Sequence, residues 1–416
     1  MAFQLMAARW LRADGRGMLS MLLTGKIAAL FMGLGMPASI MYCAASDPRT
    51  ALRLARREMK LLGVMALGLM LLGLVNRWLH WLSLDSSVEL VLVLFVLSNI
   101  ALPAFAALAL SLGSVFSYNL AALVPTAGAF VGLIVLRLTD ALDATTALGV
   151  LTAATFGGAL VPLLFLWRAT HKALEVTVES SLGSQWRVAM LGFASNGFTV
   201  LTFRADIFLV ASLAGGVAAA GIYSVGIILA ELAVKVPQWA GAVLSPRVAS
   251  REHGALNQTI SLFWLSLILA GIAYLPILVF PSAMKWLLTA ILGPDFVGVY
   301  PVLVALFPRA LAQAGGTILF SNLSGKGYTR YHPLATLAGL IVTVVCDLLL
   351  IPRFGLVGAA IGGAVGLIPS NGIAFLGFLR HNGIGVGEFI RRSRAWAAAC
   401  LRPGWAMRRS LWSLFR

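Results

Sequence analysis

The stretch RADIFLVASLAGGVAAAGIYSVGIILAELAVKVPQWAGAVLSPR, residues 204–247, decides the fold. It holds the end of one long apolar segment, a short Gly/Ala turn and a second long apolar segment. Within these segments lie Arg204, Asp206, Glu231 and Lys235. An ionised side chain at bilayer depth costs about 2.5–3.5 kcal/mol even on insertion scales, so it normally faces a protein interior or a wet cavity. Four such residues in two segments predict a cavity.

The composition excludes a soluble protein. Hydrophobic residues make up 60% of the 416, charged residues 11%, and the mean hydropathy is +0.93. Soluble domains are about 45–50% apolar and about 25% charged. The apolar runs are about 20 residues long and lack the alternation of a membrane β-barrel. The sequence therefore predicts an all-α polytopic membrane protein.

Apolar runs of spanning length predict about eleven transmembrane helices. The expected helices cover residues 18–43, 61–82, 88–112, 116–137, 145–167, 187–213, 217–245, 257–282, 297–322, 331–351 and 356–380. The basic, Trp-containing tail that follows fits either an interfacial helix on the cytoplasmic leaflet or a mobile segment.

Lys and Arg gather in alternate connections between these helices, at residues 47–60, 168–187, 245–257 and 324–330 and after residue 380. The positive-inside rule places these connections in the cytoplasm. The same rule and anionic lipids explain the net charge of +16, so nucleic acid is not expected as a partner. The histidines and the three cysteines show no metal-ligand spacing, and no hydrolytic triad or paired-carboxylate site is evident. We expect neither a metal site nor an enzyme.

Two parts of the chain repeat one another at an offset of roughly 210 residues. Residues 111–136, SLGSVFSYNLAALVPTAGAFVGLIVL, resemble residues 322–350, NLSGKGYTRYHPLATLAGLIVTVVCDLLL. Parallel repeats of this kind form two similar bundles with a substrate site between them. The predicted organisation is an N-lobe over 1–167, a cytoplasmic linker over 168–186, a C-lobe over 187–382 and a basic tail over 383–416. The N-lobe has only five predicted helices, so residues 1–11 read as the tail of an absent first helix.

Four stretches carry a resemblance to a known family. They are ARWLRADGRGMLSML (8–22), ADIFLVASLAGGVAAAGIYSVG (205–226), LGPDFVGVYPVL (292–303) and LIPRFGLVGAAIGGAVG (350–366). The sequence resembles the Wzx-type polysaccharide flippases of the MOP superfamily, which also contains MATE drug exporters and MurJ-type lipid II flippases. The resemblance covers nearly the whole chain, and its motifs are structural.

The resemblance implies two six-helix lobes that enclose a V-shaped cavity, in the inner membrane of a bacterium. It implies that the cargo is an undecaprenyl-diphosphate-linked oligosaccharide, moved to the periplasmic leaflet by alternating access for surface polysaccharide synthesis. Membrane lipids and a polysaccharide polymerase or glycosyltransferases are the expected partners. The chain departs from the family by lacking the first helix, which helps wall a portal between the lobes. No cofactor is expected, although proton or sodium coupling is possible.

Cations in a low-dielectric cavity are suited to carry a diphosphate, and Arg adds bidentate geometry. Arg309 is the first candidate, with a buried structural pair as the alternative. Arg204 is a second candidate for the cavity, and the alternative is an ion pair with Asp206. The i,i+2 spacing puts these two residues on different faces of a helix. Lys235 is expected either to contact the phosphate or to pair with Glu231, which precedes it by four residues, the favourable order for an intrahelical ion pair. Lys26 fits a cavity or an interfacial position equally well.

Acidic and amide side chains supply the remaining candidates. Ion or proton coupling is assigned to Glu231, Asp206 and Asp347, with capping or an Arg353 partner as the alternative for Asp347. Amide side chains in the spans most often form interhelical hydrogen bonds, and the alternative is contact with sugars. The candidates for sugar contact are Gln313, Asn119, Asn196, Gln238 and Asn322. The Gly-rich run at 358–366 has no preceding strand or P-loop lysine, so it reads as membrane helix packing.

Two competing functions remain open. A cation-coupled MATE-class exporter would bind cationic drugs through buried carboxylates, whereas the deep cations here outnumber the deep carboxylates and favour an anionic cargo. A non-transporting scaffold for a synthase complex is the third possibility.

Overall fold

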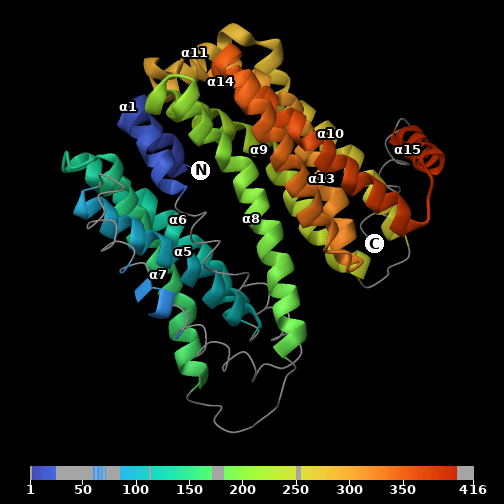
Figure 1. Cartoon of the computed structure of the whole chain (residues 1–416), viewed down its shortest axis with the longest axis horizontal. Coiled ribbons are helices and arrows are strands. Elements are labelled where there is room, and N and C mark those ends of the chain that lie inside the picture. The colour runs from blue at the N-terminus through green and yellow to red at the C-terminus, as the bar shows by residue number, and fades with distance from the viewer. Residues whose placement is uncertain are drawn as a thin grey trace. The chain divides into compact units, whose positions relative to one another are not determined.

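The computed structural model describes residues 2–24, 60, 63–65, 67–68, 71, 85–111, 114–170, 182–249 and 254–400. Every regular element in these ranges is a helix, which confirms the predicted all-α fold class (Figure 1). The chain divides into two compact units, Met1–Leu201 and Thr202–Arg416. Most of the predicted helix 18–43 and most of the predicted helix 61–82 lie outside the described residues.

The first unit is built around a helical hairpin. Its helices are α1 (Ala2–Leu23), α5 (Ser86–Ser111), α6 (Val115–Leu138), α7 (Ala144–Thr170) and the start of α8 (Leu182–Leu213). Helix α7 packs against α1, α5 and α6, and Leu19, Phe95, Leu133 and Leu148 are fully buried between these helices. The bounds of α5, α6 and α7 agree with the predicted helices to within a few residues.

Helix α1 begins earlier than the sequence suggests. Residues 1–11 were expected to be a helical tail and the next helix to start at 18, but α1 runs from Ala2 to Leu23. It breaks at Arg12, whose φ of 57° and ψ of −172° are not helical. The second helical segment therefore starts directly after Arg12. The predicted start at residue 18, which was based on apolar length alone, is too late.

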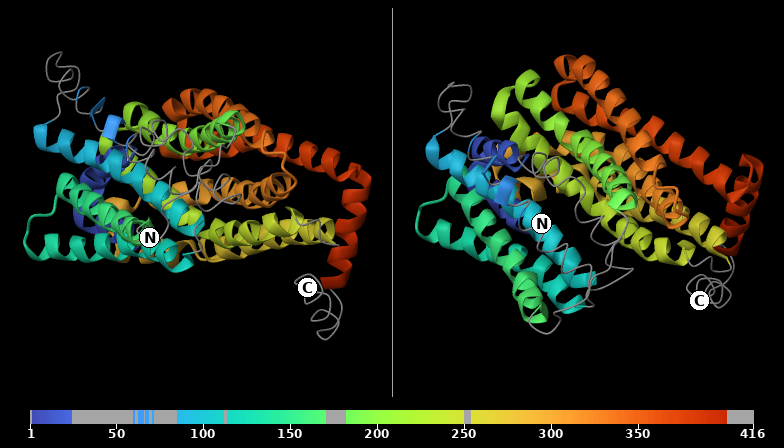
Figure 2. Two further views of the ribbon diagram at one scale, coloured as in Figure 1. Left: turned by 90° about the horizontal axis from the view of Figure 1, so that it is seen from below. Right: turned by 60° about the horizontal axis from the view of Figure 1, so that its bottom comes forward.

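The second unit is arranged around one central helix. In chain order it contains α9 (Gly216–Ala249), α10 (Ala255–Val279), α11 (Pro281–Leu292), the 3-10 turn η1 (Pro294–Phe296), α12 (Val299–Ala305), α13 (Phe307–Gly325), α14 (Tyr331–Asn382) and α15 (Val386–Cys400). Helix α13 packs against α9, α10 and α14, as the views in Figures 1 and 2 show. Tyr223, Val234, Ala314 and Ala360 belong to the buried core of this unit.

Helix α14 contains two helical arms that fold back on one another. Gly355, with φ 57° and ψ −133°, interrupts the helix between the two predicted spans 331–351 and 356–380. A Cβ on Gly358 would meet the carbonyl oxygen of Leu350, and one on Gly366 would meet the Thr343 hydroxyl. The arms are therefore antiparallel and in close contact, and the Gly-rich run at 358–366 is a packing surface.

The first unit contains a matching hairpin. Helices α6 and α7 are antiparallel, with Gly132 against Val150 and Gly158 against Pro125. When the sequence is shifted by roughly 210 residues, as in the predicted repeat, α6 corresponds to the first arm of α14 and α7 corresponds to the second arm. Both hairpins thus use glycines where one helix crosses the other, which supports the internal repeat.

One predicted helix is broken in the structure. Residues 297–322 were expected to form a single span, but they form α12 and α13, which meet at Leu306 with a bend of 53°. Pro308 lies in the first turn of α13. A proline has no N–H and disfavours helical geometry at the residue before it, so a helix begins there more readily than it continues through. The connection before this region also contains α11, which the sequence analysis did not assign.

Six of the described helices are long and apolar enough to cross a membrane, and α12 with α13 would make a seventh. Helix α9 has an exposed apolar face, on which Leu232, Val236, Trp239 and Val243 lie at helical spacing. Large apolar side chains at helical spacing on an outer face are stable in hydrocarbon. The chain is a multi-pass membrane protein.

Candidate functional site

A buried ion pair lies at the centre of the second unit. The Nη1 of Arg309, in the first turn of α13, donates to Oδ2 of Asp206 on α8 at 2.9 Å. Arg309 is 4% exposed and Asp206 is fully buried. The alternative predicted for Arg309, a buried structural pair, is the arrangement found. Asp206 takes Arg309 as its partner, and the local pair with Arg204 does not form among the described residues.

Further groups hold the Asp206 carboxylate in place. The hydroxyl of Tyr223, on α9, donates to Oδ2 at 2.9 Å, and the backbone N–H of Ile207 donates to Oδ1 at 3.0 Å. Nη1 of Arg309 also lies 3.4 Å from the Tyr223 hydroxyl. A buried charge is stable only when it is paired and hydrogen-bonded, and Asp206 meets both conditions.

A second carboxylate lies beside this pair. Asp347, on the first arm of α14, is fully buried and lies within electrostatic range of both Asp206 and Arg309. Gly362 and Gly363, on the second arm, leave the space that the Asp347 carboxylate and the Arg309 guanidinium occupy, because a Cβ on either glycine would overlap them. The missing side chains of adjacent glycines thus admit two oppositely charged groups into the hairpin.

The hydrogen bonding of Asp347 differs from that of Asp206. Neither carboxyl oxygen of Asp347 accepts a hydrogen bond from the described residues, and the same holds for the nearby hydroxyls of Thr343 and Tyr274. The predicted partner Arg353 is exposed, so the Asp347–Arg353 pair is not formed.

We call Asp206, Tyr223, Arg309 and Asp347 the ionic cluster. With both carboxylates ionised, it would hold one positive and two negative charges.

A polar flank runs along the middle of α9. Glu231, Lys235 and Gln238 follow one another at helical spacing and are all half-buried, beside the exposed apolar residues of that helix. Nζ of Lys235 donates to Oε1 of Gln238 at 3.3 Å. The predicted Glu231–Lys235 ion pair is not formed in the described part of the chain. The ammonium group therefore has a neutral partner near the centre of a span.

The other predicted residues are dispersed. Arg204 and Gln313 are half-buried, and Asn119 is exposed. Asn322 is buried and makes the interhelical bonds that are the default for a membrane amide: its Nδ2 donates to Thr259, and its Oδ1 accepts from Asn382. Lys26 and the side chain of Asn196 lie outside the described residues.

Sequence reasoning missed Tyr223, which completes the ionic cluster, and the nearby Tyr274. Neither tyrosine carries a charge, so a search for charges in apolar segments passes over both. The spacing of Gly358, Gly362 and Gly366 by four residues was the available signal, because it marks one helix face that another helix approaches closely.

The fold is that of a known class of helical transporters. No family model matches the sequence, and no curated protein matches it. Among solved structures, an inward-facing multidrug resistance MATE family transporter of the MOP superfamily is 14% identical with a TM-score of 0.62, over 94% of this chain and 95% of that one. A second match is a MOP superfamily transporter from Pyrococcus furiosus, described as having a binding pocket of reversed polarity. It is 15% identical with a TM-score of 0.63, over 92% of this chain and 94% of that one.

The lipid II flippase MurJ, in an inward closed conformation, is similar as well. It is 13% identical with a TM-score of 0.54, over 95% of this chain and 91% of that one. Drug exporters and a lipid flippase therefore share this helical arrangement. The chain has the fold of MOP superfamily transporters, and its cargo has to be argued from its own residues.

Proposed function

We propose that this protein is a MOP-type transporter that flips an undecaprenyl-diphosphate-linked oligosaccharide across the inner membrane of a bacterium by alternating access. The observation that carries the proposal is the polar flank of α9. A transport route through about 30 Å of hydrocarbon needs polar groups at mid-span, and an anionic head group needs cations that no carboxylate already neutralises. Lys235 meets both requirements.

The ionic cluster changes the roles assigned to the charged residues. Arg309 is neutralised by Asp206, so it positions α13 against α8, and the cargo cations become Lys235 and Arg204. Arg204 is half-buried and forms no ion pair among the described residues. Lys235 offers the diphosphate a point charge, and Gln238 offers the sugars an amide.

We assign the coupling role to Asp347. An ionised carboxylate without hydrogen bonds in an apolar lobe is costly, and uptake of a proton or a small cation removes that cost. The charged and titratable groups that face Asp347 are Arg309 on α13, Asp206 on α8 and Tyr223 on α9. Binding and release at Asp347 would favour different arrangements of the lobe, as alternating access requires.

Reconstitution tests the proposed function directly. Proteoliposomes containing the protein and a fluorescent undecaprenyl-diphosphate oligosaccharide should transfer the labelled lipid to the outer leaflet, where a membrane-impermeant quencher or glycosidase reaches it. Lys235→Gln should slow this transfer at least tenfold. Lys285→Gln is the matched control, since Lys285 is exposed on α11 and lies over the Tyr300 ring, 5.1 Å from its centroid. Equal transfer by wild type and Lys235→Gln would reject the role of the polar flank.

An exporter of cationic compounds is the second candidate. Its supporting observation is the excess of carboxylate over guanidinium in the ionic cluster, because buried carboxylates are suited to cations. The same proteoliposomes loaded with a cationic dye separate the two functions. Dye export without movement of the labelled lipid would establish the exporter and reject the flippase.

A further inference from the structure

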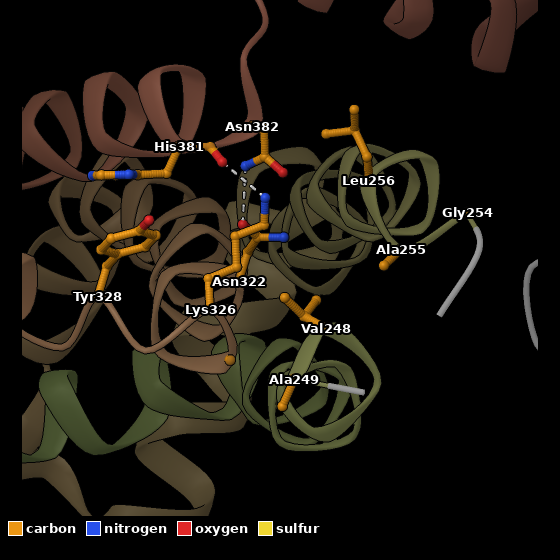
Figure 3. Close-up of a pocket in the computed structure, with 11 residues that line it drawn as sticks. Val248, Ala249, Gly254, Ala255, Leu256, Asn322, Lys326, Tyr328, His381 and Asn382 are labelled. Atoms are coloured by element: carbon orange, nitrogen blue, oxygen red, sulfur yellow. Dashed lines mark hydrogen bonds between the residues drawn. The ribbon is translucent and has the colours of Figure 1, made fainter. Parts of the chain in front are cut away.

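A polar cavity of about 520 Å³ opens at one end of the second unit, away from the ionic cluster. The end of α9, the start of α10, the end of α13 and the end of α14 surround it (Figure 3). In the sequence, these helix ends belong to the cation-bearing connections 245–257 and 324–330 and to the end of the last span. The charge distribution assigns this end to the cytoplasm.

Positive charge dominates this cavity. Lys326 lines it, and Arg330 and Arg380 lie with Lys326 within electrostatic range of the His381 ring, which also lines it. None of its described lining residues is acidic. The C-terminal ends of α9, α13 and α14 each bring about half a negative charge, which the full charges of the three cations exceed.

Hydrogen-bonding groups complete the lining. Nζ of Lys326 donates to the carbonyl oxygen of His381 at 2.9 Å, as Figure 3 shows, which leaves two of its three hydrogens for another acceptor. Asn382 also lines the cavity, and its Nδ2 donates to Oδ1 of Asn322 at 3.1 Å and to the carbonyl oxygen of Phe378 at 2.8 Å, so this side chain fixes the wall. Gly254, the N-cap of α10, provides no side-chain cap, so backbone N–H groups of the first turn border the cavity.

The aromatic side chains fix the geometry of the wall. The His381 ring is stacked on Tyr328 with a centroid distance of 3.5 Å, and its Nε2 lies 2.9 Å from the Tyr331 hydroxyl. Partial burial lowers the pKa of the Lys326 ammonium. A bound anion would supply the opposite charge that this group lacks.

We propose that this cavity binds a phosphate group, supplied either by an anionic phospholipid head group or by a soluble phosphate. The proposal is independent of the cargo proposed above, because it concerns the end of the lobe and uses neither the polar flank nor the ionic cluster. A lipid phosphate at this position would hold the ends of four helices together at the membrane surface.

The test uses the full-length protein in detergent. Melting temperature is measured during titration with phosphatidylglycerol, with zwitterionic phosphatidylcholine and with inorganic phosphate, and bound lipids are counted by native mass spectrometry. Phosphatidylglycerol should stabilise the protein more than phosphatidylcholine. Stabilisation by phosphatidylglycerol alone identifies a lipid head group, and stabilisation by inorganic phosphate identifies a soluble ligand. If neither anion stabilises the protein, the proposal is wrong.

Variants locate the effect. Lys326→Gln should weaken anion binding about fivefold, as expected for one basic residue near a membrane surface, and Lys326→Arg should retain it. Since Lys326 also caps α14, the double variant Arg330→Gln/Arg380→Gln provides a second test that leaves this cap intact. Arg353→Gln removes an exposed charge from the turn at the other end of the α14 arms and should bind as wild type. Equal binding by the double variant and wild type would overturn the assignment.

Discussion

Arg309 and Asp206 are bonded at 2.9 Å although 103 residues separate them in the chain. The bond joins the start of α13 to α8, and Tyr223 of α9 donates to the same carboxylate oxygen. Three helices of the second unit therefore share one buried charge pair. Removing one partner of such a pair leaves the other as an unpaired buried charge.

Breaking this pair should destabilise the protein strongly. Replacing Arg309 by methionine leaves Asp206 charged and buried, which costs about 3–5 kcal/mol. The measurement is the melting temperature in detergent. Arg353→Met is the control, because that guanidinium is exposed and its loss should leave the melting temperature unchanged. Equal melting temperatures for the two variants would contradict a structural role for Arg309.

Asp347 should respond in the opposite way. Asp347→Asn replaces a buried carboxylate that lacks hydrogen bonds by a neutral group of similar shape, so the melting temperature should stay the same or rise. Transport by this variant should lose its dependence on pH or on the coupling cation. Asp140→Asn, at an exposed residue in the connection after α6, is the control. A fall in melting temperature with unchanged coupling would show that Asp347 is a structural anion.

The hairpin of α14 should not tolerate side chains at its contact. In Gly358→Ala the new Cβ would overlap the carbonyl oxygen of Leu350, and a backbone atom has little freedom to move away. We expect a loss of about 1–3 kcal/mol in stability. Gly372→Ala lies on the same arm with no atom within 4 Å of its Cβ, so it should be neutral or slightly stabilising. Thermal unfolding of both variants in the same detergent provides the comparison.

The attachment of α15 should depend on pH in the acid range. The hydrogen bond from Arg392, followed by the charge of Arg391, lowers the pKa of Glu388 below its ordinary value of 4.5. Because the folded-state pKa is lowered, the contribution of Glu388 is complete above pH 4.5 and is lost as pH falls through the lowered pKa. Arg392 also donates to Asn257 of α10, so this contact ties α15 to the bundle.

Hydrogen–deuterium exchange of residues 386–400 checks the prediction. Glu388→Gln should increase exchange in α15 at neutral pH, and the wild type should approach the variant as the pH is lowered. Asp295→Asn, at the exposed turn η1, should not affect α15. The idea fails if the exchange of wild type and Glu388→Gln is the same at neutral pH.

Much of the fold could be predicted because apolar length and helical composition suffice for it. The bounds of α5, α6, α7, α9 and α10 follow the apolar runs closely. The break at Leu306 was missed because hydropathy continues across it, although Pro308 gave a local signal. Helix α11 was missed because it lies in a connection and is shorter than a span.

The site was predicted less well because its partners are distant in the sequence. Periodicity indicated that Arg204 and Asp206 point to different faces of α8, but it does not show which cation replaces Arg204. The choice of Arg309 depends on how α13 packs beside α8 and α9. The position of Asp347 likewise depends on Gly362, a residue without a side chain on the opposite arm.

The hairpin of α14 also has a consequence for how the protein is made. Its arms are joined by a turn at Gly355 and fit together through glycines, so the interface forms from consecutive parts of the chain. Helices α8, α9 and α13 are synthesised before this hairpin, so the hairpin is the last part of this core to be made. Its second arm covers Asp347 through the space left at Gly362.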